Sequence, residues 1–140
     1  MARIFWDTNL FIYLLEDDGE RGERVAQIRQ RMLERGDHLY TSTLTLGEVL
    51  VKPHESGDDD LARNFEAAIT ASATVVAFDL GAARTFASIR ANQSIRPPDA
   101  IQLACAALAR TDLFITNDDR LARAHVAGVQ FISSLANAPI

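Results

Sequence analysis

The sequence predicts an α/β fold: a single domain with a central, mostly parallel sheet of four to five strands and helices on both faces. Short apolar runs alternate along the chain with longer segments of helical periodicity, which is typical of strand–helix–strand units with right-handed crossovers. The length of 140 residues suits one hydrophobic core and is short for two domains. We therefore expect residues 1–140 to form one domain.

The first quarter of the chain predicts one strand and two helices. Residues 2–6 (ARIFW) are a short apolar run of strand type, and residues 9–16 continue with helical periodicity. A second helix is predicted at residues 20–35, and Gly36 would end it because glycine readily adopts the left-handed conformation of a helix C-cap. The apolar positions at helical spacing in this second helix are Val25, Ile28, Met32 and Leu33.

The next segment predicts a strand at residues 38–42 and a helix at residues 43–51. We expect this helix to end before Pro53, since proline has no N–H to donate within a helix. Asp58 is placed to cap a further helix over residues 61–72. The positions of that helix expected to face the core are Leu61, Phe65, Ala68 and Ile69.

The second half of the chain continues the alternation. Strands are predicted at residues 74–78, 113–116 and 129–132. Helices are predicted at residues 79–91, 100–110 and 118–124. Asp79 is interpreted as a plain cap of the first of these helices, and Pro97 and Pro98 suit the start of the second.

Four acidic residues lie where strand-like and helix-like segments meet. Asp7 ends the first strand, Glu48 lies in the first turns after the second strand, and Asp118 follows the fourth. Ligands of parallel sheets bind beyond the carboxyl ends of the strands. Asp99 begins a helix that runs antiparallel to the fourth strand, so its N-terminus lies at the same edge. We therefore expect the four carboxylates to meet there.

Each acid also has a simpler structural explanation. Asp7 and Asp118 could be helix N-caps, and Asp99 is favoured by the dipole of the helix that it begins. Thr45 and Glu48 have the spacing of a capping box. Capping alone does not explain why every strand exit but the third carries an acid close to one shared edge.

A cluster of carboxylates is a hard-oxygen environment that suits Mg²⁺ or Mn²⁺. Such an ion lowers the pKa of a bound water and neutralises charge on a phosphoryl oxygen, so phosphodiester hydrolysis is its natural use here. Other classes of enzyme lack their characteristic residues in this sequence. His38, His54 and His125 share no metal-binding spacing, there is no G-x-S-x-G motif, and Cys105 is the only cysteine. An aspartyl-phosphate phosphatase would usually have aspartate where Asn9 stands.

The motifs together resemble the PIN-domain family. They are D-T-N at the end of the first strand, T-x-x-E in the helix after the second, D-A-I-Q-L-A at a helix start and T-N-D after a late strand. Their order and the length of the chain are similar to the VapC-type ribonuclease toxins of type II toxin–antitoxin systems. The resemblance implies a Mg²⁺- or Mn²⁺-dependent endoribonuclease, a homodimer, and inhibition by a cognate VapB-type antitoxin whose C-terminal segment wraps the toxin.

The resemblance also implies roles for single residues. Asp7, Glu48, Asp99 and Asp118 would form the catalytic and metal-binding quartet, with Asp7 and Asp99 as direct ligands. Asn9 and Thr116 match supporting polar positions that orient a carboxylate or a water. The T-N-D register favours Asp118 over its neighbour Asp119 as the site residue.

The charge of the chain limits how it can bind RNA. A net charge of −5 is the wrong sign for binding nucleic acid over the whole surface, but it allows a local basic rim. The thirteen arginines outnumber the single Lys52, and a guanidinium binds phosphate through a planar fork of donors. Arg96 is the candidate substrate-binding residue because it lies close to Asp99. A genome bias toward alanine and arginine codons is an equal explanation of the arginine content.

Neither a membrane-spanning run nor the layout of a signal peptide is present, so we expect a cytoplasmic protein. Two alternatives to a toxin stay open. One is a housekeeping RNA- or DNA-processing nuclease with the same site. The other is a non-catalytic, doubly wound binding module whose acids are helix caps. The compact chain, without an added nucleic-acid module, favours the toxin.

Overall fold

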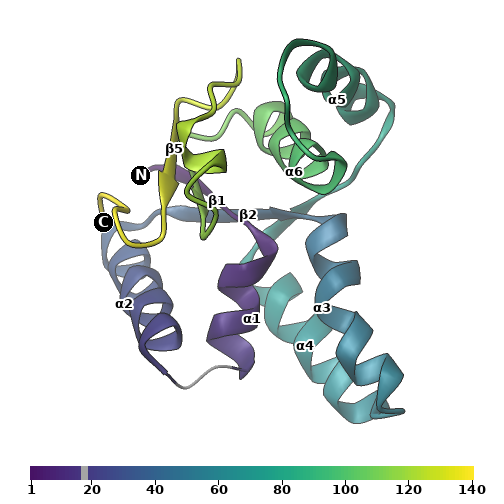
Figure 1. The fold of residues 1–140 in the computed structure, drawn as a ribbon. Helices are drawn as coiled ribbons and strands as arrows, with labels where there is room; N and C mark the ends of the chain where they lie inside the picture. The colour runs from purple at the N-terminus through teal and green to yellow at the C-terminus, as the bar shows by residue number, and fades with distance from the viewer. Residues whose placement is uncertain (17–18) are drawn as a thin grey trace.

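The computed structural model describes residues 1–16 and 19–140. Within this part of the chain, one parallel sheet has five strands in the order β3-β2-β1-β4-β5 (Figure 1). The strands are β1 (Arg3–Trp6), β2 (His38–Ser42), β3 (Thr74–Val76), β4 (Leu113–Thr116) and β5 (Phe131–Ser134). The predicted α/β fold with a parallel sheet is confirmed.

The centre of the sheet is formed by β1 and its two neighbours. Ile4 of β1 pairs with Leu39 of β2 on one side and with Leu113 of β4 on the other. All residues of β4 and the last three of β1 are buried. A strand covered on both faces needs apolar side chains on both, which explains the continuous apolar runs in these segments.

Helices cover both faces of the sheet (Figure 1). The faces alternate along β1, so that Ile4 and Trp6 contact one layer of helices and Phe5 contacts the other. The first layer holds α1 (Thr8–Glu16), α2 (Glu20–Arg35), α3 (Thr43–Glu55) and α4 (Asp59–Ser72). The second holds α5 (Leu80–Asn92), α6 (Pro97–Leu108) and the short 3₁₀ helix η1 (Leu121–Arg123).

The predicted end of the third helix before Pro53 is wrong, because α3 continues to Glu55 with Pro53 buried inside it. Proline removes one hydrogen bond of the helix and crowds the carbonyl four residues earlier, a cost that falls here on the last turns of α3. The last turn is closed by the N–H of Ser56 to the carbonyl of Lys52 at 3.1 Å and by the N–H of Asp58 to that of Pro53 at 2.9 Å.

Some residues predicted to face the core lie on the surface. Leu33 of α2 is 57% exposed, while Val25, Ile28 and Met32 are buried as predicted. In α4 the buried positions are Ala62, Phe65 and Ile69, whereas Leu61 and Ala68 are exposed. In α4 the buried stripe passes through Ala62 instead of Leu61, and in α2 it excludes Leu33, because the packed face is set by the neighbouring elements and not by apolar spacing alone.

The predicted helix ends are mostly confirmed. Gly36 ends α2 with a φ of 72° and donates its N–H to the carbonyl of Leu33. The side chain of Asp79 accepts from the N–H of Ala82 at 2.9 Å, so Asp79 is a cap as predicted. The helix predicted at residues 118–124 is reduced to the three residues of η1.

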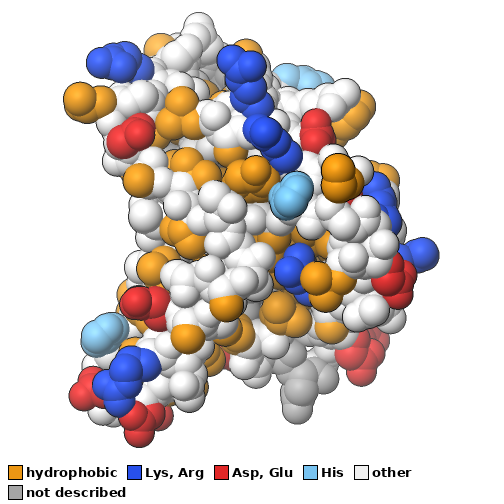
Figure 2. All heavy atoms as spheres, turned by 180° about the vertical axis from the view of Figure 1, so that it is seen from behind, with side chains coloured by type: hydrophobic (Ala, Val, Ile, Leu, Met, Phe, Trp, Pro, Cys, Tyr) orange, Lys and Arg blue, Asp and Glu red, His pale blue; other side chains and the backbone are white. Residues whose placement is uncertain are grey.

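One face of the molecule carries side chains of both charges. On the face seen from behind, basic and acidic side chains are interspersed (Figure 2). Among the described residues, no helix has both the length and the apolar content that a membrane span requires.

Candidate active site at the carboxyl edge of the sheet

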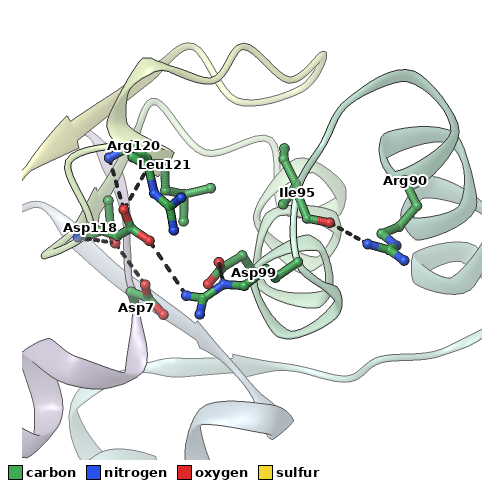
Figure 3. A network of polar contacts seen from close by, with 9 residues as sticks. Asp7, Arg90, Ile95, Asp99, Asp118, Arg120 and Leu121 are labelled. Carbon is green, nitrogen blue, oxygen red and sulfur yellow. Dashed lines mark hydrogen bonds and ion pairs between the residues drawn. The ribbon is translucent and has the colours of Figure 1, made fainter.

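The structure brings the four predicted acids to the carboxyl edge of the sheet. Asp7 follows β1, Asp118 follows β4, Glu48 projects from α3, and Asp99 lies in the first turn of α6. Asp7 and Glu48 are linked through Thr8, while Asp99 and Asp118 are linked through Arg96. Figure 3 shows Asp7, Asp99 and Asp118 around one shared space.

Asp7 is the buried centre of this arrangement, with 8% of its surface exposed. Its Oδ1 accepts from the N–H of Thr8 at 2.8 Å, and its Oδ2 accepts from the hydroxyl of Thr116 at 2.9 Å. Burial raises the pKa of Asp7 to about 6 against the opposing effect of these hydrogen bonds. The negative charges of Asp99 and Glu48 act in the same direction as burial and contribute to this raised pKa.

A buried polar network supports Asp7 and Glu48, and Gln102 is its centre. Gln102 is 2% exposed. Its Nε2 donates to the hydroxyl oxygens of Thr8 at 2.9 Å and Thr45 at 2.7 Å, and its Oε1 accepts from Ser42. Sequence reasoning missed this residue. A single amide inside the alanine-rich run of residues 100–107 was the available signal, because a buried polar side chain needs partners.

Glu48 is exposed as a residue, but its carboxylate is held in place. Oε1 of Glu48 accepts from the hydroxyl of Thr8 at 2.6 Å. The capping box suggested by Thr45 and Glu48 is absent, because Ser42 is the N-cap of α3 and accepts from the N–H of Thr45 at 3.3 Å. The carboxylate of Glu48 therefore faces the site rather than the end of its own helix.

Arg96 lies between Asp99 and Asp118. Its Nε is 3.4 Å from Oδ2 of Asp99, and its Nη2 is 3.7 Å from Oδ2 of Asp118. Burial raises the pKa of Asp99, the positive charge of Arg96 lowers it, and the negative charge of Asp118 raises it again. Arg96 thus supplies a positive charge between these two carboxylates, whose negative charges repel each other.

Asp118 combines a cap with a group that faces the site. Its Oδ1 accepts from the N–H of Arg120 at 2.9 Å and of Leu121 at 3.3 Å, as a helix cap would. Its Oδ2 is left to face Arg96. The neighbouring Asp119 is exposed and lines a different surface pocket, so the structure directs Asp118 and not Asp119 toward Asp99.

Of the two supporting residues, only Thr116 contacts the acids. It donates to Asp7 and accepts from the N–H of Asp118 at 3.1 Å, so it links two of the four acidic positions. Asn9 is exposed, and its side chain makes no hydrogen bond within residues 1–16 and 19–140. The structure thus does not bring Asn9 into the polar network.

The donor set fits a hard divalent cation. Across the described residues, no group of three His, Cys, Asp or Glu side chains has the geometry of a metal site. Mg²⁺, however, is commonly bound through one or two carboxylates and keeps several waters. Buried Asp7, which is costly to ionise, and the neighbouring Asp99 supply oxygen donors where negative charge needs neutralisation.

Comparisons with known proteins find a matching family model and structures of similar fold. Residues 4–126 match the model of the PIN domain. VapBC2 from Rickettsia felis, solved bound to a promoter DNA fragment, is similar at a TM-score of 0.74 and 11% identity, over 94% of this chain and 98% of that one. A toxin–antitoxin complex from Klebsiella pneumoniae is similar at a TM-score of 0.66 and 25% identity, over 90% and 94%.

DNA-bound VapBC from Salmonella typhimurium is also similar, at a TM-score of 0.69 and 22% identity, over 96% of this chain and 99% of that one. No curated protein matches the chain in sequence. The family match covers most of the chain and includes the strands and helices that carry all four acids. The chain therefore belongs to the PIN-domain family.

Proposed function

We propose that this protein is a Mg²⁺- or Mn²⁺-dependent endoribonuclease and the toxin of a VapBC-type toxin–antitoxin pair. The observation that carries the proposal is the meeting of Asp7, Glu48, Asp99 and Asp118 at the carboxyl edge of the sheet. Membership of the PIN-domain family and the similarity to VapBC structures support it.

In this proposal Asp7 and Asp99 bind the cation, and Glu48 and Asp118 complete the negative site. When bound, the cation supplies an activated water and neutralises charge on the phosphoryl group. Thr116 and the N–H of Thr8 hold both oxygens of Asp7, so that its carboxylate is positioned before substrate arrives. Arg96, which is ion-paired with Asp99 and Asp118, would offer its guanidinium fork to the RNA phosphate.

The partners follow from the same assignment. The similar VapBC structures are complexes of toxin and antitoxin, so we propose a cognate VapB-type antitoxin for this chain. A homodimer and a cytoplasmic location belong to the same proposal. RNA is the substrate class that the VapC-type assignment implies.

Cleavage by the purified protein, freed of antitoxin, tests the proposal. Structured RNAs are incubated with and without Mn²⁺, using the parent protein and the variants Asp7→Asn and Asp99→Asn. We expect metal-dependent cleavage by the parent and little by either variant. Asp79→Asn is the matched control, since Asp79 caps α5 and should retain activity. Equal cleavage by all four proteins would show that a contaminant is active and would remove the assignment of these residues.

A further inference from the structure

A pocket opens directly beside the acidic site. It has a volume of about 380 Å³, and Asp99 and Asp118 are among the residues that line it. One wall is the turn before α6, with Ile95 and Arg96, and the other is the segment after β4, with Arg120, Leu121 and Arg123. Figure 3 shows Arg120 and Leu121 on one side and Ile95 and Asp99 on the other. A volume near 400 Å³ is at the small end of ligand sites.

The two walls are held in place by hydrogen bonds. Nε2 of Gln93 donates to the carbonyl of His125 at 2.8 Å, which joins one wall to the end of the other. Nη1 of Arg90 donates to the carbonyl of Ile95 at 2.6 Å. Ile95 and Leu121 are 8% and 5% exposed, so the apolar surfaces of the pocket are anchored in the core. The pocket is therefore formed before a ligand binds.

The pocket is lined by three guanidinium groups. Arg96 is engaged with Asp99 and Asp118. Arg120 and Arg123 have no hydrogen-bonded or ion-paired side chain within the part of the chain that the structure describes. Arg120 is near enough to Asp99 to lower its pKa. In a chain of net charge −5, two free cations beside one small pocket select for an anion.

We propose that this pocket is a nucleotide subsite for single-stranded RNA, with Arg120 and Arg123 binding the phosphate next to the scissile one. The guanidinium forks match phosphate oxygens, and the apolar groups of Ile95, Leu121 and Ala124 offer a surface to an unstacked base. A base held in a duplex cannot enter a pocket of this kind. The inference rests on the proposed nuclease function and names part of its substrate-binding surface.

RNA binding in the absence of cleavage tests the subsite. The anisotropy of a short fluorescent single-stranded RNA is measured in EDTA with the parent, Arg120→Gln and Arg123→Gln. Each variant should weaken binding about two- to fivefold, the effect of a screened charge contact. Each should also lower the slope of log K against log salt by about 0.7, the value for one phosphate contact on a single strand. Arg31→Gln, an exposed arginine on α2, is the matched control and should change neither.

Further arms separate the alternatives. Arg120→Lys keeps the charge but loses the fork, so it should recover the salt slope and only part of the affinity. Duplex RNA of the same sequence should bind equally to the parent and the variants. Equal RNA binding by Arg120→Gln, Arg123→Gln and Arg31→Gln would overturn the subsite. The subsite would also be overturned if an oligoglutamate peptide required both arginines for binding and RNA did not. That result would assign the pocket to an acidic protein partner.

Cleavage measured in parallel keeps this inference apart from the proposed function. If the parent protein cleaves RNA with Mn²⁺ but Arg120→Gln and Arg123→Gln bind RNA as Arg31→Gln does, the proposed nuclease function is supported and the subsite is overturned. A parent that cleaves no RNA, although its RNA binding depends on Arg120 and Arg123, removes the nuclease and supports the pocket as a nucleic-acid site.

Discussion

At the scale of one residue, the burial of Asp7 lowers the stability of the fold at a position proposed to bind a cation. Its carboxylate is buried, which raises its pKa to about 6 from the ordinary value of 3.8. Between these two values the folded protein binds more protons than the unfolded chain, so stability falls as the pH rises through this window. Above about pH 6 the cost of a buried charge is fully present, and a cation would offset it.

Asp7→Asn is therefore expected to stabilise the protein in metal-free buffer at pH 7.5. A neutral amide of the same shape avoids the burial of charge, and about two pKa units correspond to about 1–3 kcal/mol in the free energy of unfolding. The gain should disappear below about pH 4, where Asp7 is protonated in both states. Urea unfolding in EDTA across this range measures it. A gain that does not change with pH would show that burial of charge is not its cause.

Arg96 forms ion pairs with Asp99, a proposed ligand of the cation, and with Asp118. Arg96→Gln should tighten Mn²⁺ binding, measured by titration calorimetry, by up to about fivefold, since the ion pairs that are lost lie on the surface. Arg120→Gln removes the same charge from the same pocket without breaking these ion pairs. If both variants bind Mn²⁺ with one affinity, general repulsion and not competition for the carboxylates is responsible.

At the scale of the elements, the site depends on how α1, α3 and α6 meet. Gln102 on α6 contacts Thr8 at the start of α1 and Thr45 on α3, so one amide fixes three helices around Asp7. Thr8 in turn holds Glu48. The same contacts that pack the helices therefore also position two of the four carboxylates.

Gln102→Leu should lower both stability and catalysis. It leaves buried hydroxyl groups without their partner, at a cost of about 1–3 kcal/mol in the free energy of unfolding. It should also reduce kcat at temperatures where the variant is fully folded, because the carboxylates lose their positioning. Cys105→Ala is the control, since it creates a cavity on the same helix but against the opposite core cluster. A kcat that falls equally in both variants would mean that Gln102 acts only through stability.

Element boundaries show where sequence reasoning succeeds and fails. The strands are found because β1 and β4, buried on both faces, leave uninterrupted apolar runs. Pro53 led to a wrong helix end. A helix tolerates one missing donor in its last turn when the N–H groups of the following residues close that turn. Leu33 misleads because periodicity marks apolar positions without showing how wide the packed stripe is. Such widths depend on the neighbouring helices.

At the scale of the whole molecule, topology made the site predictable. Parallel strands place their exits at one edge, so Asp7, Glu48 and Asp118 could be grouped from the chain order alone. The pocket walls could not be predicted, because the path of the segment around Arg120 and Arg123 is set by tertiary contacts such as the one between Gln93 and His125. The role of Gln102 could not be predicted either, because it depends on Thr8 and Thr45, which only the folded structure places beside it.

The assembled site also predicts a response of the whole fold to metal. A ligand that binds only the folded protein stabilises it by RT ln(1 + [L]/Kd), so Mn²⁺ at about 100 times its Kd should add about 2.7 kcal/mol. Thermal unfolding of the parent should shift upward, and the shift should be lost in Asp99→Asn. An unchanged melting temperature at every Mn²⁺ concentration would favour the binding module over the nuclease.

The position of β4 in the sheet determines when the site can form during synthesis. Ile4 near the start of the chain pairs with Leu113 near its end, and Thr116 of the same late strand completes the surroundings of Asp7. A growing polypeptide on the ribosome holds Asp7 and Glu48 long before this strand emerges. Under the proposed function, a nascent chain that has not yet reached residue 116 lacks a complete site and should not cleave RNA.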